Sequence, residues 1–324
     1  MTVKVVSATQ SFGRTRPEVF QMLREAGVEL VQPSWKGNPT EADLVEAVKE
    51  ASGLIVSTQK VTERVIAAAP DLRIIMKYGA GLDNVDVEAA QEHGVQVANT
   101  GAANADAVAD FTIGLLLSVS RWIPRADAVL KSGGWERLLG HELWGKTVGI
   151  VGLGAIGRRV ALRLAGFNVT ILAFDVAQDP EFAARHGVRY TSLDDLLSAS
   201  DFVTVHAPAL PETKGLFNYN RFARMKRSAY FVNVARGALV DEEGLCQALK
   251  EGLIAGAALD VFAQEPPVNS PLLSLDKAVL DKLVLTPHMG AYSREAFARM
   301  DLAAAEGVLA ALRGMRAPGN GTGR

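Results

Sequence analysis

Short apolar runs alternate with amphipathic stretches along most of this chain. Helix-type periodicity lies between several of the runs, as in Pro17–Ala26, Glu41–Ala51 and Ile156–Leu164. Strands rich in Val and Ile, without polar alternation, are typical of parallel sheets buried on both faces, so the pattern predicts an α/β fold. The expected strands are Val3–Val6, Val28–Val31, Leu54–Val56, Arg73–Met76 and Val95–Ala98, then Thr147–Val151, Val169–Phe174, Phe202–Val205, Ala229–Val234, Ile254–Leu259 and Leu283–Leu285.

The two series of strands indicate two domains, which agrees with 324 residues at roughly 150 residues per domain. A long helical stretch, Asn104–Leu130, separates the series and contains one strong breaker, Pro124. The last amphipathic stretch, Ser293–Leu312, has no strand after it, so it must pack on a domain that is already formed. We therefore expect a discontinuous first domain at residues 1–98 and 293–324, with a second domain at 99–292 inserted into it.

Charge and composition exclude several classes of protein. Lys plus Arg number 34 and Asp plus Glu 36, so the net charge of −2 indicates no nucleic-acid or anionic-membrane partner. The longest candidate span, Phe111–Ser120, is far shorter than the ~20 residues that cross a bilayer. The first residues do not have the pattern of a signal peptide. With one cysteine, Cys246, and no metal-ligand spacing, we expect a cytoplasmic protein without a disulfide or a metal.

A glycine motif follows the expected strand Thr147–Val151 and opens a helical pattern. Gly152, Gly154 and Gly157 fit the G-x-G-x-x-G pattern of dinucleotide-binding loops. The first glycine permits the tight turn, the second lets the backbone approach a pyrophosphate, and the third lets helix and strand pack closely. The helix N-terminus offers N–H groups to the phosphates. The alternative is a tight strand-to-helix turn that binds nothing.

Asp175 stands at the end of the next apolar run, at about the 20-residue spacing that the motif requires. Its carboxylate would bind the ribose hydroxyls and repel a 2′-phosphate. Two like charges about 5 Å apart repel by about 3 kcal/mol at an effective dielectric constant near 20. Residues 176–178 contain no Arg or Lys that would reverse this preference. The sequence therefore predicts NAD rather than NADP as the cofactor.

Ionisable residues follow several of the other expected strands. His206 and Arg236 each follow one strand, Asp260 and Glu265 follow another, and His288 follows the last. The carboxyl ends of parallel strands meet at one edge of a sheet, where ligands bind. We therefore expect these side chains to converge on one crevice.

Three of these residues have the chemistry that a dehydrogenase needs. His288 can exchange a proton with the reacting oxygen, and Glu265 can stabilise the charged imidazole. The Arg236 guanidinium can bind the carboxylate of a 2-keto or 2-hydroxy acid with two parallel hydrogen bonds. Each residue also has an ordinary alternative, as a solvated loop arginine, a turn residue or a structural histidine.

Several longer motifs cover most of the chain. They lie at Tyr78–Asp86, Asn104–Asp110, Gly152–Gly157, Asn233–Asp241, Ala258–Pro266 and Thr286–Gly290. Together they resemble the D-isomer-specific 2-hydroxyacid dehydrogenases, which include phosphoglycerate, D-lactate, glycerate and formate dehydrogenases. The resemblance implies a Rossmann-type NAD-binding domain at 99–292, inserted into a smaller flavodoxin-like substrate domain at 1–98 and 293–324. It also implies a homodimer formed through the helices from about Asn104 to Trp135. We expect no C-terminal regulatory domain of the kind found in some phosphoglycerate dehydrogenases.

The same resemblance implies roles for individual residues. The catalytic set would be Arg236, Glu265 and His288, in agreement with their positions at strand ends. The substrate would be bound around Gly79, Ala80, Gly81 and Asn104. Tyr78 is expected to line the same pocket, with the alternative that it is a packing aromatic. The expected cofactor contacts are Gly152, Gly154, Ala155, Ile156, Gly157, Asp175, His206, Ala207, Pro208, Val234, Ala235, Asp260 and Val108, with Val108 near the nicotinamide and Asp260 at its carboxamide.

These observations predict an NAD-dependent oxidoreductase that interconverts a D-2-hydroxy acid and its 2-keto acid. Two alternatives stay open. Phosphite dehydrogenase resembles this family and has similar catalytic residues. Transcriptional co-repressors of the same superfamily bind NAD and retain the catalytic set, so an NAD-responsive binding protein is also consistent with the sequence.

Overall fold

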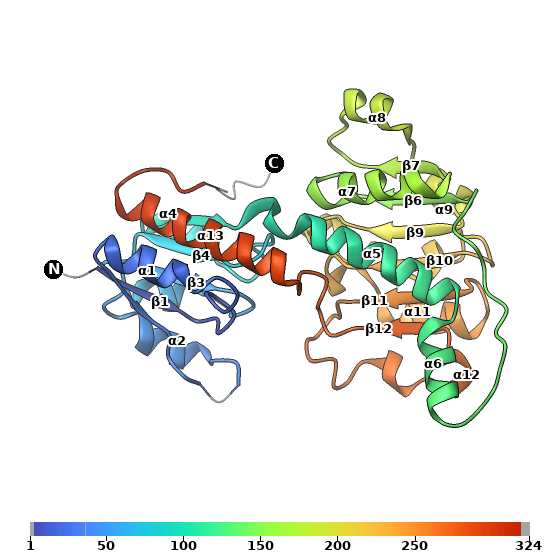
Figure 1. Cartoon of the computed structure of the whole chain (residues 1–324), viewed down its shortest axis with the longest axis horizontal. Helices are drawn as coiled ribbons and strands as arrows, with labels where there is room; N and C mark the ends of the chain where they lie inside the picture. The colour runs from blue at the N-terminus through green and yellow to red at the C-terminus, as the bar shows by residue number, and fades with distance from the viewer. Residues whose placement is uncertain (1–2, 36, 319–324) are drawn as a thin grey trace. The chain divides into compact units, whose positions relative to one another are not determined.

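The computed structural model describes residues 3–35 and 37–318 (Figure 1). The chain forms two compact units, one from residues 1–104 and 291–324 (unit 1) and one from residues 105–290 (unit 2). The sequence placed the two boundaries a few residues away, at 98/99 and 292/293. Residues 101–104 group with unit 1 because η1 (Gly101–Asn104) packs on α13 (Arg294–Leu312).

Unit 1 contains a five-stranded parallel sheet in the order β2-β1-β3-β4-β5. The strands are β1 (Val3–Ser7), β2 (Val28–Val31), β3 (Gly53–Val56), β4 (Ile74–Lys77) and β5 (Gln96–Asn99). Besides η1 and α13, the helices of this unit are α1 (Glu18–Glu25), α2 (Glu41–Val48), α3 (Glu63–Ala67) and α4 (Val87–Glu92).

The sheet of unit 1 is buried on both faces. Val5 and Ile55 point to the face covered by α1 and α13, whereas Val6 and Leu54 point to the face covered by α2, α3 and α4. Successive residues of a strand point to opposite faces, so an uninterrupted apolar run is what a doubly covered sheet requires.

Unit 2 contains a seven-stranded parallel sheet in the order β12-β11-β10-β9-β6-β7-β8. The strands are β6 (Thr147–Val151), β7 (Thr170–Phe174), β8 (Val188–Tyr190), β9 (Phe202–Val205), β10 (Tyr230–Asn233), β11 (Gly256–Leu259) and β12 (Leu283–Leu285). The strand order reverses between β6 and β9. Open parallel sheets bind their ligands beyond the carboxyl ends of the strands at such a switch point.

Two helices of unit 2 precede β6, and the others lie between successive strands. The helices of this unit are α5 (Ala105–Ser120), α6 (Ile123–Lys131), α7 (Ala155–Leu164), α8 (Pro180–His186), α9 (Leu193–Ala199), α10 (Tyr219–Phe222), α11 (Glu242–Lys250) and α12 (Lys277–Leu280), with short 3₁₀ turns η2 (Ala165–Phe167), η3 (Pro211–Thr213), η4 (Gly237–Leu239) and η5 (Pro271–Ser274).

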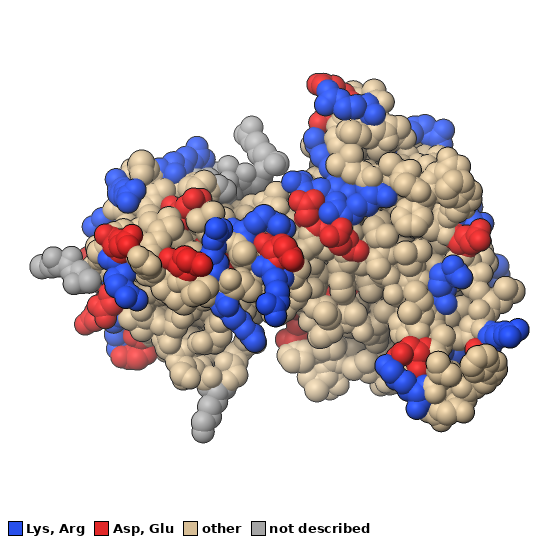
Figure 2. All heavy atoms as spheres, viewed as in Figure 1, with Lys and Arg blue, Asp and Glu red and all other residues tan. Residues whose placement is uncertain are grey.

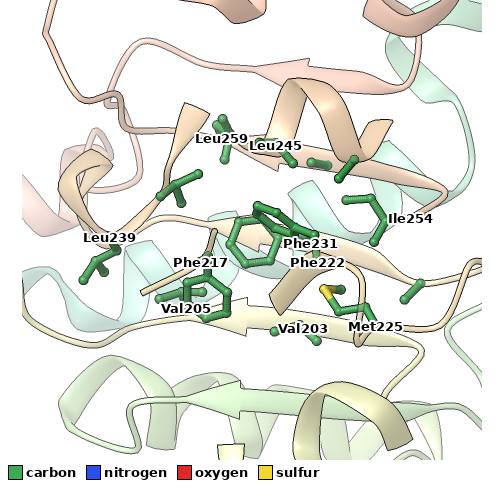
Figure 3. Packing of buried hydrophobic residues seen from close by; sticks show 14 of the residues in the cluster. Val203, Val205, Phe217, Phe222, Met225, Phe231, Leu239, Leu245, Ile254 and Leu259 are labelled. Carbon is green, nitrogen blue, oxygen red and sulfur yellow. The ribbon is translucent and has the colours of Figure 1, made fainter. Parts of the chain in front are cut away.

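One face of this sheet packs on a cluster of aromatic and aliphatic side chains (Figure 3). Phe217, Phe222 and Phe231 are fully buried at its centre, with Phe217 and Phe231 ring centroids 4.8 Å apart. Leu245 of α11 joins the same cluster. This packing anchors α11 and the segments that follow β10 and β11.

The α/β fold predicted from the apolar runs is confirmed, and each expected strand is present within a few residues of its predicted bounds. Strand β8 was not predicted, because its three residues at the sheet edge include Arg189 and form no apolar run. The long helical stretch ends at Ser120 and restarts at Ile123, across Trp122 in the left-handed region (φ 58°). Pro124 lies in the first turn of α6, where a missing N–H costs little.

The longest apolar helical stretch is longer than the ten residues predicted from the sequence. Among the described residues, the helical stretch Gly101–Ser120 has the length and composition of a membrane span, longer than the segment predicted above. The alanines before Phe111 extend it. The buried residues of α5 pack on α7 and on strands β10 to β12, so this apolar composition is that of a core helix.

Charged side chains of both signs are interspersed on the visible face of each unit (Figure 2). This mixture agrees with the small net charge of −2.

Candidate active site

The glycine loop connects β6 to α7. Gly152 adopts a φ of +94°, and a Cβ there would lie 2.7 Å from the backbone nitrogen of Ala207. A Cβ on Gly157 would lie 2.1 Å from the Gly152 carbonyl oxygen, so helix and loop touch at that point. At Gly154 nothing lies within 4 Å of the Cβ position. The tight turn at Gly152 and the close packing at Gly157 thus agree with the motif, and the pyrophosphate contact at Gly154 stays a prediction.

The N-terminus of α7 faces this open space. Gly154 is the N-cap and has no side chain to satisfy the first N–H groups, which include those of Ala155 and Ile156. A diphosphate would supply the missing acceptors and interact favourably with the helix dipole. The loop therefore fits a dinucleotide on its own geometry.

Asp175 lies at the rim of the loop, immediately after β7. Its Oδ2 accepts a hydrogen bond from Leu153 N at 2.6 Å, and its Oδ1 accepts one from Ala177 N at 2.9 Å. These bonds hold the carboxylate beside the glycine loop, where it retains lone pairs for ribose hydroxyls.

Arg158, which was not predicted as a site residue, also makes contacts at this rim. Its Nε donates to the Leu153 carbonyl at 3.1 Å, its guanidinium pairs with Asp179 at 2.7 Å, and its Cζ lies 5.1 Å from the Phe182 ring centroid. The sequence feature that could have indicated this role is an arginine one turn into the helix that follows the glycine motif. Two of its partners, Asp179 and Phe182, come from the next strand-helix unit and are not visible in a local pattern.

The segment after β9 borders the loop on its other side, so His206, Ala207 and Pro208 lie at the switch point. The His206 ring accepts or donates a hydrogen bond with Thr204 Oγ1 at 3.0 Å. Its Nδ1 is shielded from solvent and has no partner among the residues that the structure describes. Burial lowers the pKa of His206 to about 3, so the ring is neutral. An unsatisfied ring nitrogen beside the open glycine loop is a further feature that fits a bound ligand.

The turn after β10 carries Val234, Ala235 and Arg236. Asn233, which is fully buried, accepts a hydrogen bond from Ala235 N at 3.0 Å and donates to the Arg236 carbonyl at 2.9 Å. The Arg236 guanidinium donates to the Ala235 carbonyl at 2.7 Å. Asn233 is thus a second residue whose role in shaping the site was not predicted.

His288 and Glu265 form a direct pair, with 2.7 Å between Nδ1 and Oε2. The other Glu265 oxygen accepts a hydrogen bond from Phe262 N at 3.1 Å. Burial alone would raise the pKa of Glu265. The hydrogen bond to His288, with smaller contributions from the His288 charge, the Phe262 N–H and the Arg236 charge, instead lowers this pKa below its ordinary value. The carboxylate is therefore ionised at neutral pH and suits a protonated imidazole.

Asp260 holds the turn that presents His288. Its carboxylate, only 1% exposed, accepts hydrogen bonds from the Thr286 hydroxyl at 2.7 Å and from Met289 N and Gly290 N at 2.9 and 2.8 Å. Its carbonyl accepts a bond from His288 N at 2.8 Å. The carboxylate therefore shapes this turn, and its contact with a nicotinamide carboxamide stays a prediction. Val108 of α5 lies 3.7 Å from the Cβ position of Gly290 and so borders the same turn.

The expected substrate residues belong to unit 1. Tyr78 is only 3% exposed, its ring packs edge-on to Phe12, and its hydroxyl donates to Asp301 at 2.8 Å. Burial and this carboxylate raise the pKa of Tyr78 well above its ordinary value. The Tyr78 side chain is thus packed in the core of unit 1, and its contact with a substrate stays a prediction.

The glycine-rich turn after Tyr78 is partly exposed. Gly79 adopts a φ of +136°, and its N–H donates to Thr100 Oγ1 at 3.0 Å. Ala80 is exposed and Gly81 half-buried. Asn104, the last residue of this part of unit 1, is buried, and its Oδ1 has no partner among the described residues. The substrate roles of these residues stay predictions.

Comparison with known proteins places the chain in a family. Residues 113–290 match the family described as D-isomer specific 2-hydroxyacid dehydrogenase, NAD binding domain. The chain is 45% identical over 291 residues to D-3-phosphoglycerate dehydrogenase of Mycobacterium bovis, covering 89% of this chain and 54% of that protein. It thus spans about half the length of the phosphoglycerate dehydrogenases it matches.

Two further proteins are similar over nearly their whole length. A glyoxylate reductase of Thermofilum pendens is 41% identical over 309 residues, covering 92% of this chain and 89% of that protein. The crystal structure of the TT0316 protein of Thermus thermophilus superposes with a TM-score of 0.88 at 35% identity, covering 99% and 100% of the two chains. The cofactor of unit 2 is NAD, and the chain belongs to the D-isomer specific 2-hydroxyacid dehydrogenase family.

Proposed function

We propose that this protein is an NAD-dependent oxidoreductase that interconverts a D-2-hydroxy acid and its 2-keto acid. The observation that carries the proposal is the 2.7 Å contact between His288 and Glu265, in the unit that binds NAD. The pair lies beyond β11 and β12, and the glycine loop lies beyond β6 of the same parallel sheet. An acid–base pair beside a hydride carrier is the minimum machinery for carbonyl reduction.

The roles of the three side chains follow from their charges. NADH, when bound, supplies the hydride. Protonated His288 donates its proton to the carbonyl oxygen of the keto acid, and Glu265 stabilises the charged ring until that transfer. Arg236 binds the substrate carboxylate with two hydrogen bonds and polarises the carbonyl. In the oxidative direction neutral His288 accepts the hydroxyl proton.

The test is a substrate panel followed through NADH absorbance. The names of the similar proteins suggest two substrates for this panel, glyoxylate and the 2-keto acid that corresponds to D-3-phosphoglycerate. Pyruvate and hydroxypyruvate are added to the panel as further 2-keto acids. Reduction of at least one of these acids is expected. NAD reduction by phosphite instead would favour phosphite dehydrogenase, and NADH binding without any turnover would favour a binding protein of the co-repressor type.

A His288→Ala variant provides the mechanistic control for this assay. We expect its kcat to fall about 100-fold or more, the usual scale of general acid catalysis, with the NADH dissociation constant unchanged. Near-normal turnover would remove His288 from the mechanism.

A further inference from the structure

The segment that carries Glu265 has little apolar anchoring of its own. Phe262 and Leu272 are buried in the core cluster at its two ends. Between them, residues 263–266, 268 and 269 are exposed. The position of Glu265 therefore depends on the polar contacts that hold the segment.

Glu242, the first residue of α11, binds this segment at two points. Its Oε1 accepts a hydrogen bond from Ala263 N at 2.8 Å, and its Oε2 accepts one from the Ser270 hydroxyl at 2.5 Å. Glu265 lies between these two points in the chain. Hydrogen bonds to an ionised carboxylate are roughly twice as strong as neutral ones, so a single side chain closes the segment into a loop.

The helix that carries Glu242 is fixed by packing. Leu245 and Leu249 of α11 are both 0% exposed and belong to the core cluster. In Figure 3, Leu245 lies in the same group of apolar side chains as Leu259, the last residue of β11. Glu242 thus extends from a helix that is packed in the core toward a segment that has few apolar contacts of its own.

The backbone at residues 262–263 is also held from a second side. A Cβ on Gly237 would lie 1.9 Å from the Phe262 carbonyl carbon and 2.4 Å from Ala263 N, so the two segments are in close contact. Phe262 N donates to Glu265, and the next N–H along, that of Ala263, donates to Glu242. Gly237, the neighbour of Arg236, and the Glu242 carboxylate therefore both contact Ala263.

On the basis of the function proposed above, we propose that Glu242 is a positioning residue for the Glu265–His288 pair. Its carboxylate holds the 263–270 segment where Glu265 reaches His288 Nδ1. Without that carboxylate the segment is released, and Glu265 spends less time within hydrogen-bond distance of the ring.

The test compares Glu242→Ala with Glu242→Gln and with Glu243→Ala, which removes the same charge from the exposed neighbouring position. Two properties are measured: the pH profile of keto-acid reduction, and the downfield proton NMR signal of the His288 Nδ1–H, assigned by its loss in His288→Gln. We expect Glu242→Ala to weaken that signal, to lower kcat about tenfold or more, and to move the alkaline limb of the profile to lower pH. Binding of NADH should not change.

The other two variants should behave like the natural protein. In Glu242→Gln the new side-chain amide still accepts from Ala263 N and donates to the Ser270 oxygen, so activity within about threefold is expected. A folded Glu242→Ala protein with an unchanged ring signal and pH profile would overturn the proposal. If that variant does not fold, Ser270→Ala decides in its place: a weakened signal supports the role of Glu242, and an unchanged one refutes it. Because the NMR signal needs no turnover, failure of every substrate in the panel would count against the proposed function alone.

Discussion

At the scale of single residues, the site depends on one unusual backbone conformation. His288 adopts a φ of 51°, in the left-handed region that residues with a Cβ rarely enter. Such a conformation costs of order 1–2 kcal/mol and persists only where surrounding contacts hold it. Buried Asp260 supplies those contacts through its bonds to Thr286, Met289 and Gly290. The backbone turn that presents the imidazole is therefore held by a carboxylate that does not contact the ring.

Replacing Glu265 should change the pH dependence of catalysis. The pKa of Glu265 lies below its ordinary value, so its carboxylate is charged at neutral pH where it contacts the His288 ring. In Glu265→Gln a neutral amide replaces this charge, and the alkaline limb of keto-acid reduction should move to lower pH. The measurement is kcat/KM against pH. A Glu243→Gln control should keep the natural profile. An unshifted limb in Glu265→Gln would show that the Glu265 carboxylate has no role in the acid–base step.

Replacing Asp175 should relax the choice of cofactor. Its carboxylate is held beside the glycine loop by Leu153 N and Ala177 N, where it would repel a 2′-phosphate. We expect Asp175→Ser to improve NADPH binding relative to NADH by about 10- to 100-fold, less at high salt. Fluorescence titration with both nucleotides measures the ratio. Tighter binding of NADPH than NADH by the natural protein would contradict the assigned selectivity.

At the scale of elements, the connection from β6 to α7 contains one glycine that the fold requires and another that only ligand binding would require. Gly157 is required by the fold itself, because a side chain there meets the Gly152 carbonyl. Gly154 has open space at its Cβ position, so its lack of a side chain matters only when a ligand approaches. One motif thus contains two glycines under different physical constraints.

This difference predicts opposite effects of the same substitution. Gly157→Ala should lower the free energy of unfolding by about 1–3 kcal/mol, the usual cost of overpacking. Gly154→Ala should leave Tm unchanged and weaken NADH binding. Thermal melts and NADH titrations distinguish the two. Gly166→Ala, another glycine with nothing within 4 Å of its Cβ position, is the control and should change neither property.

At the scale of the whole molecule, unit 2 exposes apolar side chains between α6 and β6. Trp135, Leu139 and Trp144 are 80%, 95% and 61% exposed. Exposed apolar groups clustered in one segment are typical of a surface that another protein covers. Together with the resemblance noted from the sequence, this segment supports the proposal that the protein is a homodimer.

Light scattering tests this proposal directly. The natural protein should have twice the mass of one chain. A variant with Trp135→Lys and Leu139→Lys should be a monomer with an unchanged circular dichroism spectrum, because neither side chain is part of the core of unit 2. Leu273→Lys, at another exposed apolar position, should remain a dimer. A monomeric natural protein would refute the dimer.

Local features of this chain were readable from its sequence. The apolar runs that became β1 to β7 and β9 to β12, the helix periodicity and the glycine motif are properties of consecutive residues. Strand ends could also be read, which placed Arg236, Glu265 and His288 at one edge of a parallel sheet. Sequence similarity to the family supported the same residues. These predictions rest on short-range geometry, where neighbours in the chain are neighbours in space.

Side-chain partners were decided only by the tertiary structure. Tyr78 bonds to Asp301, 223 positions away, and Glu242 reaches Ala263 and Ser270 across a turn of the fold. Asp260, which was predicted only as a cofactor contact, also satisfies three donors of the turn after β12. Whether a polar group meets a ligand or another part of the protein depends on strand register and loop shape. Packing over long sequence distances sets both, so no local pattern specifies them.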